Sequence, residues 1–212
     1  MRDCLFLVAD KNMEGMLKGF FSRDAFHRAL DCGHFVFVPR HDLVVAHGLN
    51  DPGLYTRANE LLQTFSNTHR HAVVIVDADW DGSPGKDAIS SRLSAHLNSA
   101  GWTNDSGCGV VLDPELENWV WQDSPHVCSV LGYKGAFSEL RTTLENQGFW
   151  QENETKPDRP KEAVEWVLRQ SKIGRSSSIY QQLAMRVTTR GCTDAAFDKL
   201  RNALLQWFPA TT

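Results

Sequence analysis

The sequence predicts an α/β fold, in which a parallel sheet carries helices on both faces and a helical C-terminal part follows. Short apolar stretches alternate with stretches of helical periodicity as far as residue 113, which is the pattern of consecutive β-α-β units. The stretch AVVIVD at 72–77 is a continuous β-branched run of the kind that forms buried parallel strands. After Pro114 only helical patterns follow.

The expected strands lie in the first half of the chain. Four apolar stretches rich in β-branched or aromatic residues are predicted as strands: CLFLVA (4–9), HFVFVP (34–39), AVVIVD (72–77) and CGVVLD (108–113). Pro39 ends the second of them, and LVVA at 43–46 is interpreted as its continuation after a turn.

Helices are expected between these strands and after them. Apolar residues recur at spacings of three and four from Asn12 to Phe21, from Asp51 to Phe65 and over 86–99. Five later segments have the same periodicity: 114–123, 134–149, 160–171, 177–187 and 193–208. The polar segment ENETKPDRP (152–160) holds two prolines and is the best linker candidate. We therefore expect an α/β domain over 1–151 and a helical extension over 152–212.

Composition excludes several classes of protein. The net charge of −4 argues against a general nucleic-acid coat, and the five scattered cysteines form no CxxC pair that would suggest a disulfide framework or a zinc–thiolate site. No apolar run reaches the roughly 20 residues that cross a bilayer, and the N-terminal apolar run is too short for a signal peptide. A cytoplasmic protein without membrane segments is expected.

Acidic residues follow three of the expected strands: Asp10 and Glu14; Asp77, Asp79 and Asp81; and Asp113, Glu115 and Glu117. Because the carboxyl ends of parallel strands meet at one edge of a sheet, these three groups are expected to gather there. Residues i and i+2 of an extended chain point the same way, so Asp77 and Asp79 would face one ion. Crowded carboxylates repel one another unless a cation neutralises them, and Mg²⁺ prefers oxygen ligands. The aspartates therefore predict a metal site.

Simpler interpretations of the same residues remain open. Asp79 and Asp81 lie in a segment rich in Gly and Ser, where Asp is a normal turn residue. DADWDG also matches the start of an EF-hand loop, but Ala88 occupies the position that requires Glu. His69 and His71, just before the third strand, are interpreted as residues of a solvated loop rather than as a metal pair.

The acidic motifs resemble those of TOPRIM-like domains, and most of all the small stand-alone families related to OLD nucleases, found in bacterial defence gene clusters. In the family's V-E-G-x-x-E motif, VADKNME (8–14) places Asp10 at the first acid, Lys11 at the glycine and Glu14 at the second acid. The D-x-D motif falls on Asp77 and Asp79. The resemblance covers about residues 4–165, and the chain is also similar to a component of methylation-associated antiphage systems.

Two later segments complete the resemblance. PELENW matches an E-x-W-like motif through Glu115, Glu117 and Trp119, and KPDRPK matches a basic segment through Lys156 and Lys161. Two departures stand in the first motif. Asp10 is one methylene shorter than the family's Glu, and Lys11 replaces a glycine that permits close backbone approach.

The resemblance implies metal-assisted phosphodiester cleavage of nucleic acid, in the company of other defence-system proteins. Glu14, Asp77 and Asp79, with Asp10 at the first acid, would hold Mg²⁺ or Mn²⁺, and Glu117 would bind a second ion or act as a base. The substrate-binding residues it implies are Lys11, Lys156 and Lys161, and Trp80 is expected near the substrate.

Two other functions remain open from the sequence. The first is a non-catalytic TOPRIM-like scaffold or sensor subunit of a defence complex, which the net acidity and the Asp10 and Lys11 departures favour. The second is a phosphatase-like protein with Asp77 as nucleophile and Asp79 as acid/base, which Trp80 fits poorly. Trp119 and Trp121 are interpreted as core residues in preference to platforms that stack on bases.

Overall fold

The computed structural model describes residues 1–189 and 192–210. Four parallel strands form one sheet in the order β2-β1-β3-β4. The strands are β1 (Arg2–Val8), β2 (Leu43–Val45), β3 (His69–Asp77) and β4 (Gly107–Leu112). The α/β class and the parallel sheet are confirmed, and the apolar stretches beginning at residues 4, 43, 72 and 108 each overlap one strand.

The strand predicted at 34–39 is wrong. These residues run extended without pairing to a strand, and the short helix α3 (Pro39–Asp42) begins at the proline. Phe35 is buried and Phe37 packs on the core, while the Val36 N–H donates to the side chain of Asp3 on β1 and not to a strand backbone. The alternation of apolar residues here reflects aromatic packing and not a β-ladder.

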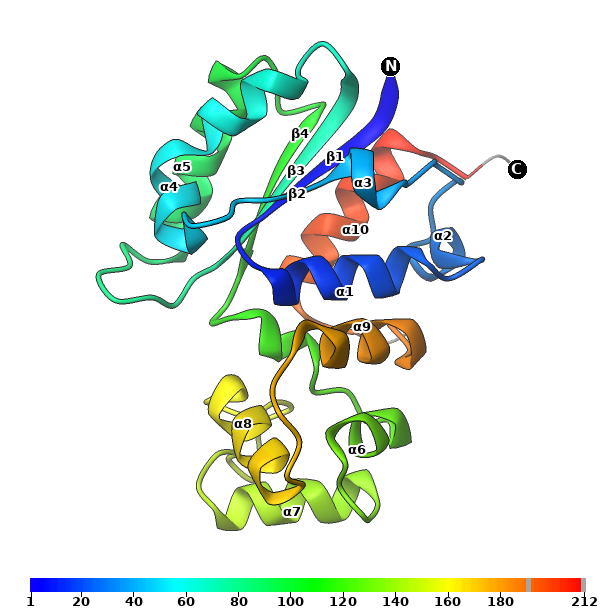
Figure 1. The fold of residues 1–212 in the computed structure, drawn as a ribbon, viewed down its shortest axis with the longest axis vertical. Coiled ribbons are helices and arrows are strands. Elements are labelled where there is room, and N and C mark those ends of the chain that lie inside the picture. The colour runs from blue at the N-terminus through cyan, green and yellow to red at the C-terminus, as the bar shows by residue number, and fades with distance from the viewer. Residues whose placement is uncertain (190–191, 211–212) are drawn as a thin grey trace.

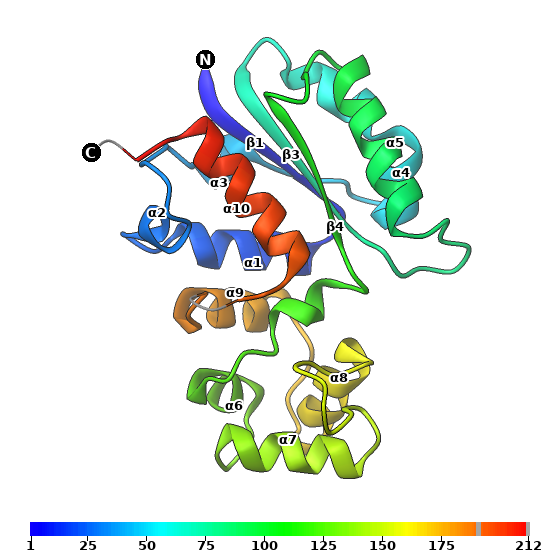
Figure 2. The same ribbon diagram turned by 180° about the vertical axis from the view of Figure 1, so that it is seen from behind.

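Helices cover both faces of the sheet (Figures 1 and 2). On one face lie α4 (Asn50–Leu62), which continues into η1 (Gln63–Phe65), and α5 (Lys86–Ser99). On the other lie α1 (Lys11–Phe21) and α10 (Ala195–Trp207), with α2 (Phe26–Ala29) beyond α1. No described helix has both the length and the apolar character needed to cross a bilayer.

Three helices form a separate lobe below the sheet in Figure 1: α6 (Pro125–Leu131), α7 (Phe137–Asn146) and α8 (Pro160–Gln170). The chain then returns, and α9 (Ser177–Arg186) packs along α1. The boundary expected after residue 151 falls between α7 and α8, inside this lobe. The helix expected at 114–123 is reduced to the single turn η2 (Leu116–Trp119), and α6 was not predicted.

Tryptophans pack the junction between the lobe and the sheet. Trp121 is 2% exposed, its ring meets that of Trp150, and its Nε1 donates to the carbonyl of Pro160 over 3.0 Å. Trp119 lies against Phe197 and its Nε1 donates to an aspartate of the α10 N-cap. Trp121 is a core residue, as expected, whereas Trp119 is partly buried and packs against the core.

The two histidines expected in a solvated loop belong instead to β3. His69 is 2% exposed, and its Nε2 lies 3.2 Å from Oδ1 of the fully buried Asp42, which also pairs with Arg2. His71 stacks on Trp207 at 4.5 Å between ring centres. β3 therefore begins earlier than its apolar run suggested: His69 is paired with Asp42, and His71 is packed against Trp207 although its buried Nδ1 has no hydrogen-bond partner among the described residues.

Helices α1 and α9 touch backbone to backbone. Gly15 and Gly19, one turn apart on α1, face the carbonyl oxygens of Ser177 and Gln181 on α9. A Cβ atom at either glycine would overlap the facing carbonyl oxygen. The close approach of the two helices therefore requires glycine at both positions.

Replacing Gly19 by alanine tests this contact. We expect Gly19→Ala to lower the free energy of unfolding by about 1–3 kcal/mol, because the helices must separate to admit the methyl group. Gly174→Ala is the matched control, since a Cβ atom there meets open space. Urea unfolding of both variants measures the effect, and equal stabilities would contradict the backbone contact.

Candidate functional site

Asp77 is the last residue of β3 and stands at the carboxyl edge of the sheet. Its backbone N–H donates to Oδ1 of Asp51 over 2.8 Å, and its own Oδ1 accepts the N–H of Leu116 over 2.8 Å. The first contact reaches the start of α4 and the second reaches η2. Asp77 thus joins two loops that follow two other strands.

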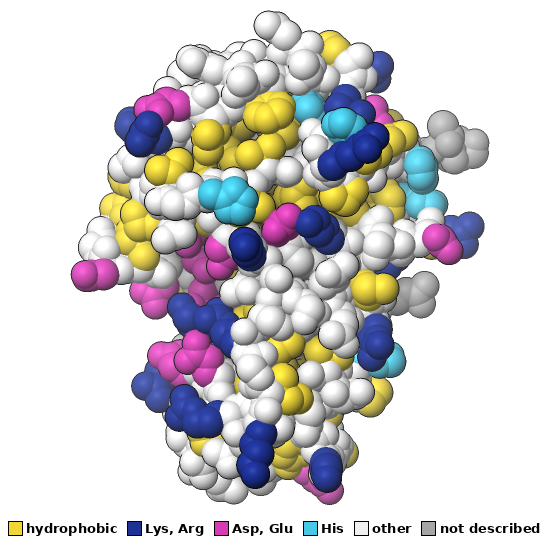
Figure 3. All heavy atoms as spheres, viewed as in Figure 1, with side chains coloured by type: hydrophobic (Ala, Val, Ile, Leu, Met, Phe, Trp, Pro, Cys, Tyr) yellow, Lys and Arg dark blue, Asp and Glu magenta, His cyan; other side chains and the backbone are white. Residues whose placement is uncertain are grey.

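Five carboxylates surround this point, and we call them the acidic cluster. Burial raises the pKa of Asp77 well above its usual range, and the charges of Asp51, Glu117, Asp10 and Glu115 raise it further. In Figure 3 acidic side chains gather where the sheet part meets the helical lobe, directly above Lys and Arg side chains. The predicted meeting of acids at this edge is present, with a different membership.

The three aspartates of the acidic cluster share one arrangement. Oδ1 of Asp10 accepts the N–H groups of Asn12 and Met13 as the N-cap of α1, while Oδ1 of Asp51 and Oδ1 of Asp77 each accept one backbone N–H. No hydrogen bond from a described residue reaches the second oxygen of any of the three. Each carboxylate is therefore oriented by backbone and keeps one oxygen for another partner.

The pKa of Asp51 shows the effect of burial and of the neighbouring carboxylates. Burial raises the pKa of Asp51 from 3.8 to about 6, the charge of Asp10 adds to the rise, and Lys161 opposes it. The N–H that Asp77 donates also favours the ionised form but does not cancel the cost of burial. A cation placed at this point would relieve the repulsion.

The two glutamates of the cluster are paired with the helical lobe. Glu115 is 6% exposed and accepts the Lys161 N–H in the first turn of α8 over 3.0 Å, with Lys161 Nζ 3.5 Å from its other oxygen. Burial and the charge of Glu117 raise the pKa of Glu115 to about 7, although Lys161 acts against the rise. Glu115 thus titrates near neutral pH while it contacts a cation.

Glu117 is more completely enclosed. It is 2% exposed, and its Oε1 accepts hydrogen bonds from Arg175 and from the hydroxyl of Tyr180. Burial and the charge of Glu117 raise the pKa of Tyr180, so its hydroxyl stays protonated and donates. Arg175 also donates to the Tyr180 hydroxyl over 2.8 Å, which closes a network between η2, α9 and the segment before α9.

The expected convergence of Glu14, Asp77 and Asp79 on one ion is not found. Glu14 pairs with Lys18 one turn along α1, with 2.5 Å between the charged atoms. Asp79 is exposed, because β3 ends at Asp77 and the Ala78 and Asp79 N–H groups both donate to the Pro114 carbonyl. The alternation that would align Asp77 with Asp79 holds only while the strand continues.

The positions of the described side chains do not form a ready metal site. Within residues 1–189 and 192–210, no group of three or more His, Cys, Asp or Glu side chains is placed to hold a metal ion as it stands. Any ion at the acidic cluster would therefore require side-chain rotation about Asp77.

The residues expected to bind substrate lie in different places. Lys161 lies beside the acidic cluster, where it pairs with Glu115. Lys156 is largely buried, and its Nζ donates to the Asn118 carbonyl over 2.7 Å. Lys11 is exposed in the first turn of α1. Trp80 is partly buried with its ring centre 6.0 Å from that of Tyr55, in the loop after β3. Of the four, only Lys161 meets the cluster through a described contact.

Three residues of this site escaped the sequence analysis. Asp51 follows the β2 strand by a few residues, so the rule that located the other acids at strand ends also applied to it. Arg175 and Tyr180 pair with Glu117 across 58 and 63 residues of sequence. No local pattern in the sequence marks such a pairing.

Comparison of the chain with protein-family models, with curated proteins and with solved structures found no match. The resemblance to TOPRIM-like domains therefore rests on the motifs alone.

The raised pKa of Asp51 predicts a pH-dependent cost. Between about pH 4 and pH 6 the folded chain holds a proton on Asp51 that the unfolded chain has lost, so stability falls as the pH rises through this range and the full cost is present at pH 7. Asp51→Asn keeps the acceptor oxygen and removes the charge. We expect it to be more stable than the parent at pH 7, by on the order of 2 kcal/mol, and to lose this advantage at pH 4.

Urea unfolding in the presence of a chelator, at both pH values, measures this difference. Asp79→Asn is the matched control, since Asp79 is exposed and outside the cluster. A stability difference between parent and Asp51→Asn that is the same at both pH values would show that Asp51 carries no strained charge.

Proposed function

We propose that this protein is an enzyme that acts on phosphodiesters with the help of a divalent cation held at the acidic cluster. The observation that carries the proposal is the crowding of charge about Asp77. Five carboxylates meet there, and only Lys161 and Arg175 oppose them among the described residues. Like charges held this close in a buried place favour a bound cation or a bound proton.

Mg²⁺ or Mn²⁺ fits the chemistry of the oxygen donors at this edge of the sheet. Asp77 would be the central ligand, with Asp10 and Asp51 contributing the oxygens that hold no hydrogen bond within the described residues. Their backbone contacts through Oδ1 orient each carboxylate, and the side chains would have to rotate for the second oxygens to share one ion. When bound, such an ion neutralises phosphate charge and lowers the pKa of water.

The neighbouring residues suit a phosphate substrate. The side chain of Lys161 is 43% exposed, so its ammonium, 3.5 Å from Glu115 Oε2, is open to a phosphate while Glu115 Oε1 holds the Lys161 backbone N–H. The pKa of Glu115, raised to about 7, suits a group that accepts and returns a proton at neutral pH. Glu117, expected as a base, is enclosed by Arg175 and Tyr180 and is better suited to positioning the turn η2.

The resemblance of the motifs adds a cellular role to this proposal. It supports a TOPRIM-like domain that processes nucleic acid in the bacterial cytoplasm, together with other proteins of an antiphage defence system. The similarity to a component of methylation-associated systems suggests that kind of defence system. No described contact bears on these finer points.

A non-catalytic scaffold or sensor is the second candidate, and one observation favours it. Both glutamates of the acidic cluster are already paired with cations: Glu115 with Lys161 of α8, and Glu117 with Arg175 in the segment between α8 and α9. A cluster that serves mainly to join sheet and lobe would keep its fold without turnover. Metal binding without cleavage would identify this case.

Removing the charge of Asp77 tests the proposed site. Asp77→Asn keeps an oxygen that accepts the Leu116 N–H, so the fold should persist. We expect Mg²⁺ or Mn²⁺ to raise the melting temperature of the parent but not that of Asp77→Asn, because an ion that binds only the folded state stabilises it by RT ln(1 + [L]/Kd). Metal-dependent cleavage of labelled DNA or RNA should vanish in the variant.

Glu14→Gln and Asp79→Asn are the matched controls, since both carboxylates lie outside the acidic cluster and both belong to the family motifs. We expect each to respond to metal as the parent does. Loss of the metal response in these two variants and its retention in Asp77→Asn would overturn the assignment, and no response in the parent would refute the metal site altogether.

A further inference from the structure

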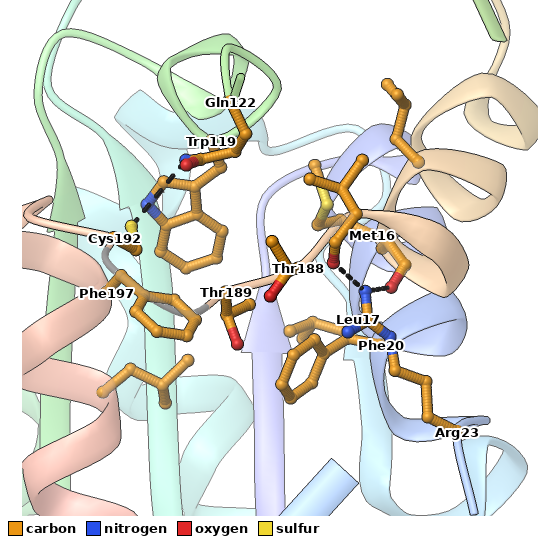
Figure 4. Close-up of a pocket in the computed structure, with 14 residues that line it drawn as sticks. Met16, Leu17, Phe20, Arg23, Trp119, Gln122, Thr188, Thr189, Cys192 and Phe197 are labelled. Atoms are coloured by element: carbon orange, nitrogen blue, oxygen red, sulfur yellow. Dashed lines mark hydrogen bonds between the residues drawn. The ribbon is translucent and has the colours of Figure 1, made fainter. Parts of the chain in front are cut away.

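An apolar pocket lies beside the C-terminal half of α1, away from the acidic cluster (Figure 4). It is bounded by α1, α9 and α10 and by residues 187–189 and Cys192 between the last two helices, and its volume is about 60 Å³. Such a volume holds roughly two to four water molecules. Its walls are mostly apolar side chains, among them Met16, Leu17, Phe20, Leu183, Phe197 and Leu200.

One charged side chain, Arg23, stands at an end of this pocket, across from Trp119 and Cys192 in Figure 4. Its Nη2 donates to the carbonyl of Ala184 and, over 2.6 Å, to that of Val187. The guanidinium carbon also lies 5.0 Å from the ring centre of Phe20. The head group is thus held in place by the α9 C-terminal turn and by an aromatic ring.

The charge of Arg23 has no carboxylate partner within ion-pair distance among the described residues. Its Nε is buried without a hydrogen-bond partner, and no described residue accepts from Nη1. Burial lowers the pKa of the Arg23 guanidinium, which records the cost of its lost hydration. Because this charge is fixed in place and has no counter-ion among the described residues, an anion bound beside it would offset the free-energy cost of burying it.

We propose that this pocket binds a small monocarboxylate with an apolar body of three to four carbons. The carboxylate would accept from Arg23 Nη1, and the apolar body would fill the space between α1, α9 and α10. The single positive charge matches one carboxylate, and the apolar walls exclude an ion that carries its full hydration shell. A multiply charged phosphate would leave most of its oxygens unpaired against these walls.

Isovalerate is the probe for this pocket, and isovaleramide is its neutral counterpart of nearly the same shape. We expect isovalerate to bind, as followed by titration in NMR spectra, and isovaleramide to bind at least about tenfold more weakly. Equal affinity for the acid and the amide would overturn the role of Arg23. Absence of isovalerate binding would overturn the proposal.

Variants separate the charge from the cavity. Arg23→Met should weaken isovalerate binding at least about tenfold, and Arg23→Lys should retain more of it, while thermal unfolding reports whether each variant folds. Ala184→Leu adds a side chain to the pocket while it keeps the backbone carbonyl that Arg23 contacts, and it should abolish binding. Met185→Leu, at a neighbouring side chain that is 49% exposed, is the matched control. Unchanged binding in Ala184→Leu would place the ligand elsewhere. These experiments use no metal and are independent of the proposed function.

Discussion

The burial of Asp77 among other carboxylates is the constraint on which the arrangement of this protein depends. The strand β3 carries it to the carboxyl edge of the sheet, and its backbone and side chain hold the starts of α4 and η2. Asp10 and Asp51 lie near this position, and burial together with mutual repulsion raises the pKa values of Asp51 and Asp77. The fold tolerates this cost because each aspartate keeps a backbone N–H on one oxygen.

Positive side chains in the helical lobe and just after it pair with two carboxylates of the acidic cluster. These pairs attach the lobe to the sheet. Lys161 begins α8 and meets Glu115, and Arg175 meets Glu117 from the segment after α8. Tyr180 completes the contact from α9, whose backbone lies against Gly15 and Gly19 of α1. Because Tyr180 falls between the two α9 residues that touch these glycines, close helix packing sets the position of a hydroxyl at the acidic cluster.

The sequence was informative where the cause of structure is local. Continuous apolar runs marked the strands, and the position of acids after strands located the edge of the sheet at which carboxylates gather. It failed at 34–39, where aromatic packing imitates a strand, and at Asp79, where the chain leaves the strand direction after Asp77. Arg175 and Tyr180 were out of reach, because their partner Glu117 is distant in sequence and only the return of α9 to α1 brings them together.

The most direct test of the central claim is an anomalous-scattering measurement on crystals soaked in Mn²⁺. The account predicts one strong peak beside Asp77, within direct coordination distance of carboxylate oxygens from Asp10 or Asp51 and absent from crystals of Asp77→Asn. A map without a peak at this edge, or with an ion held by Glu14 and Asp79 instead, would contradict it.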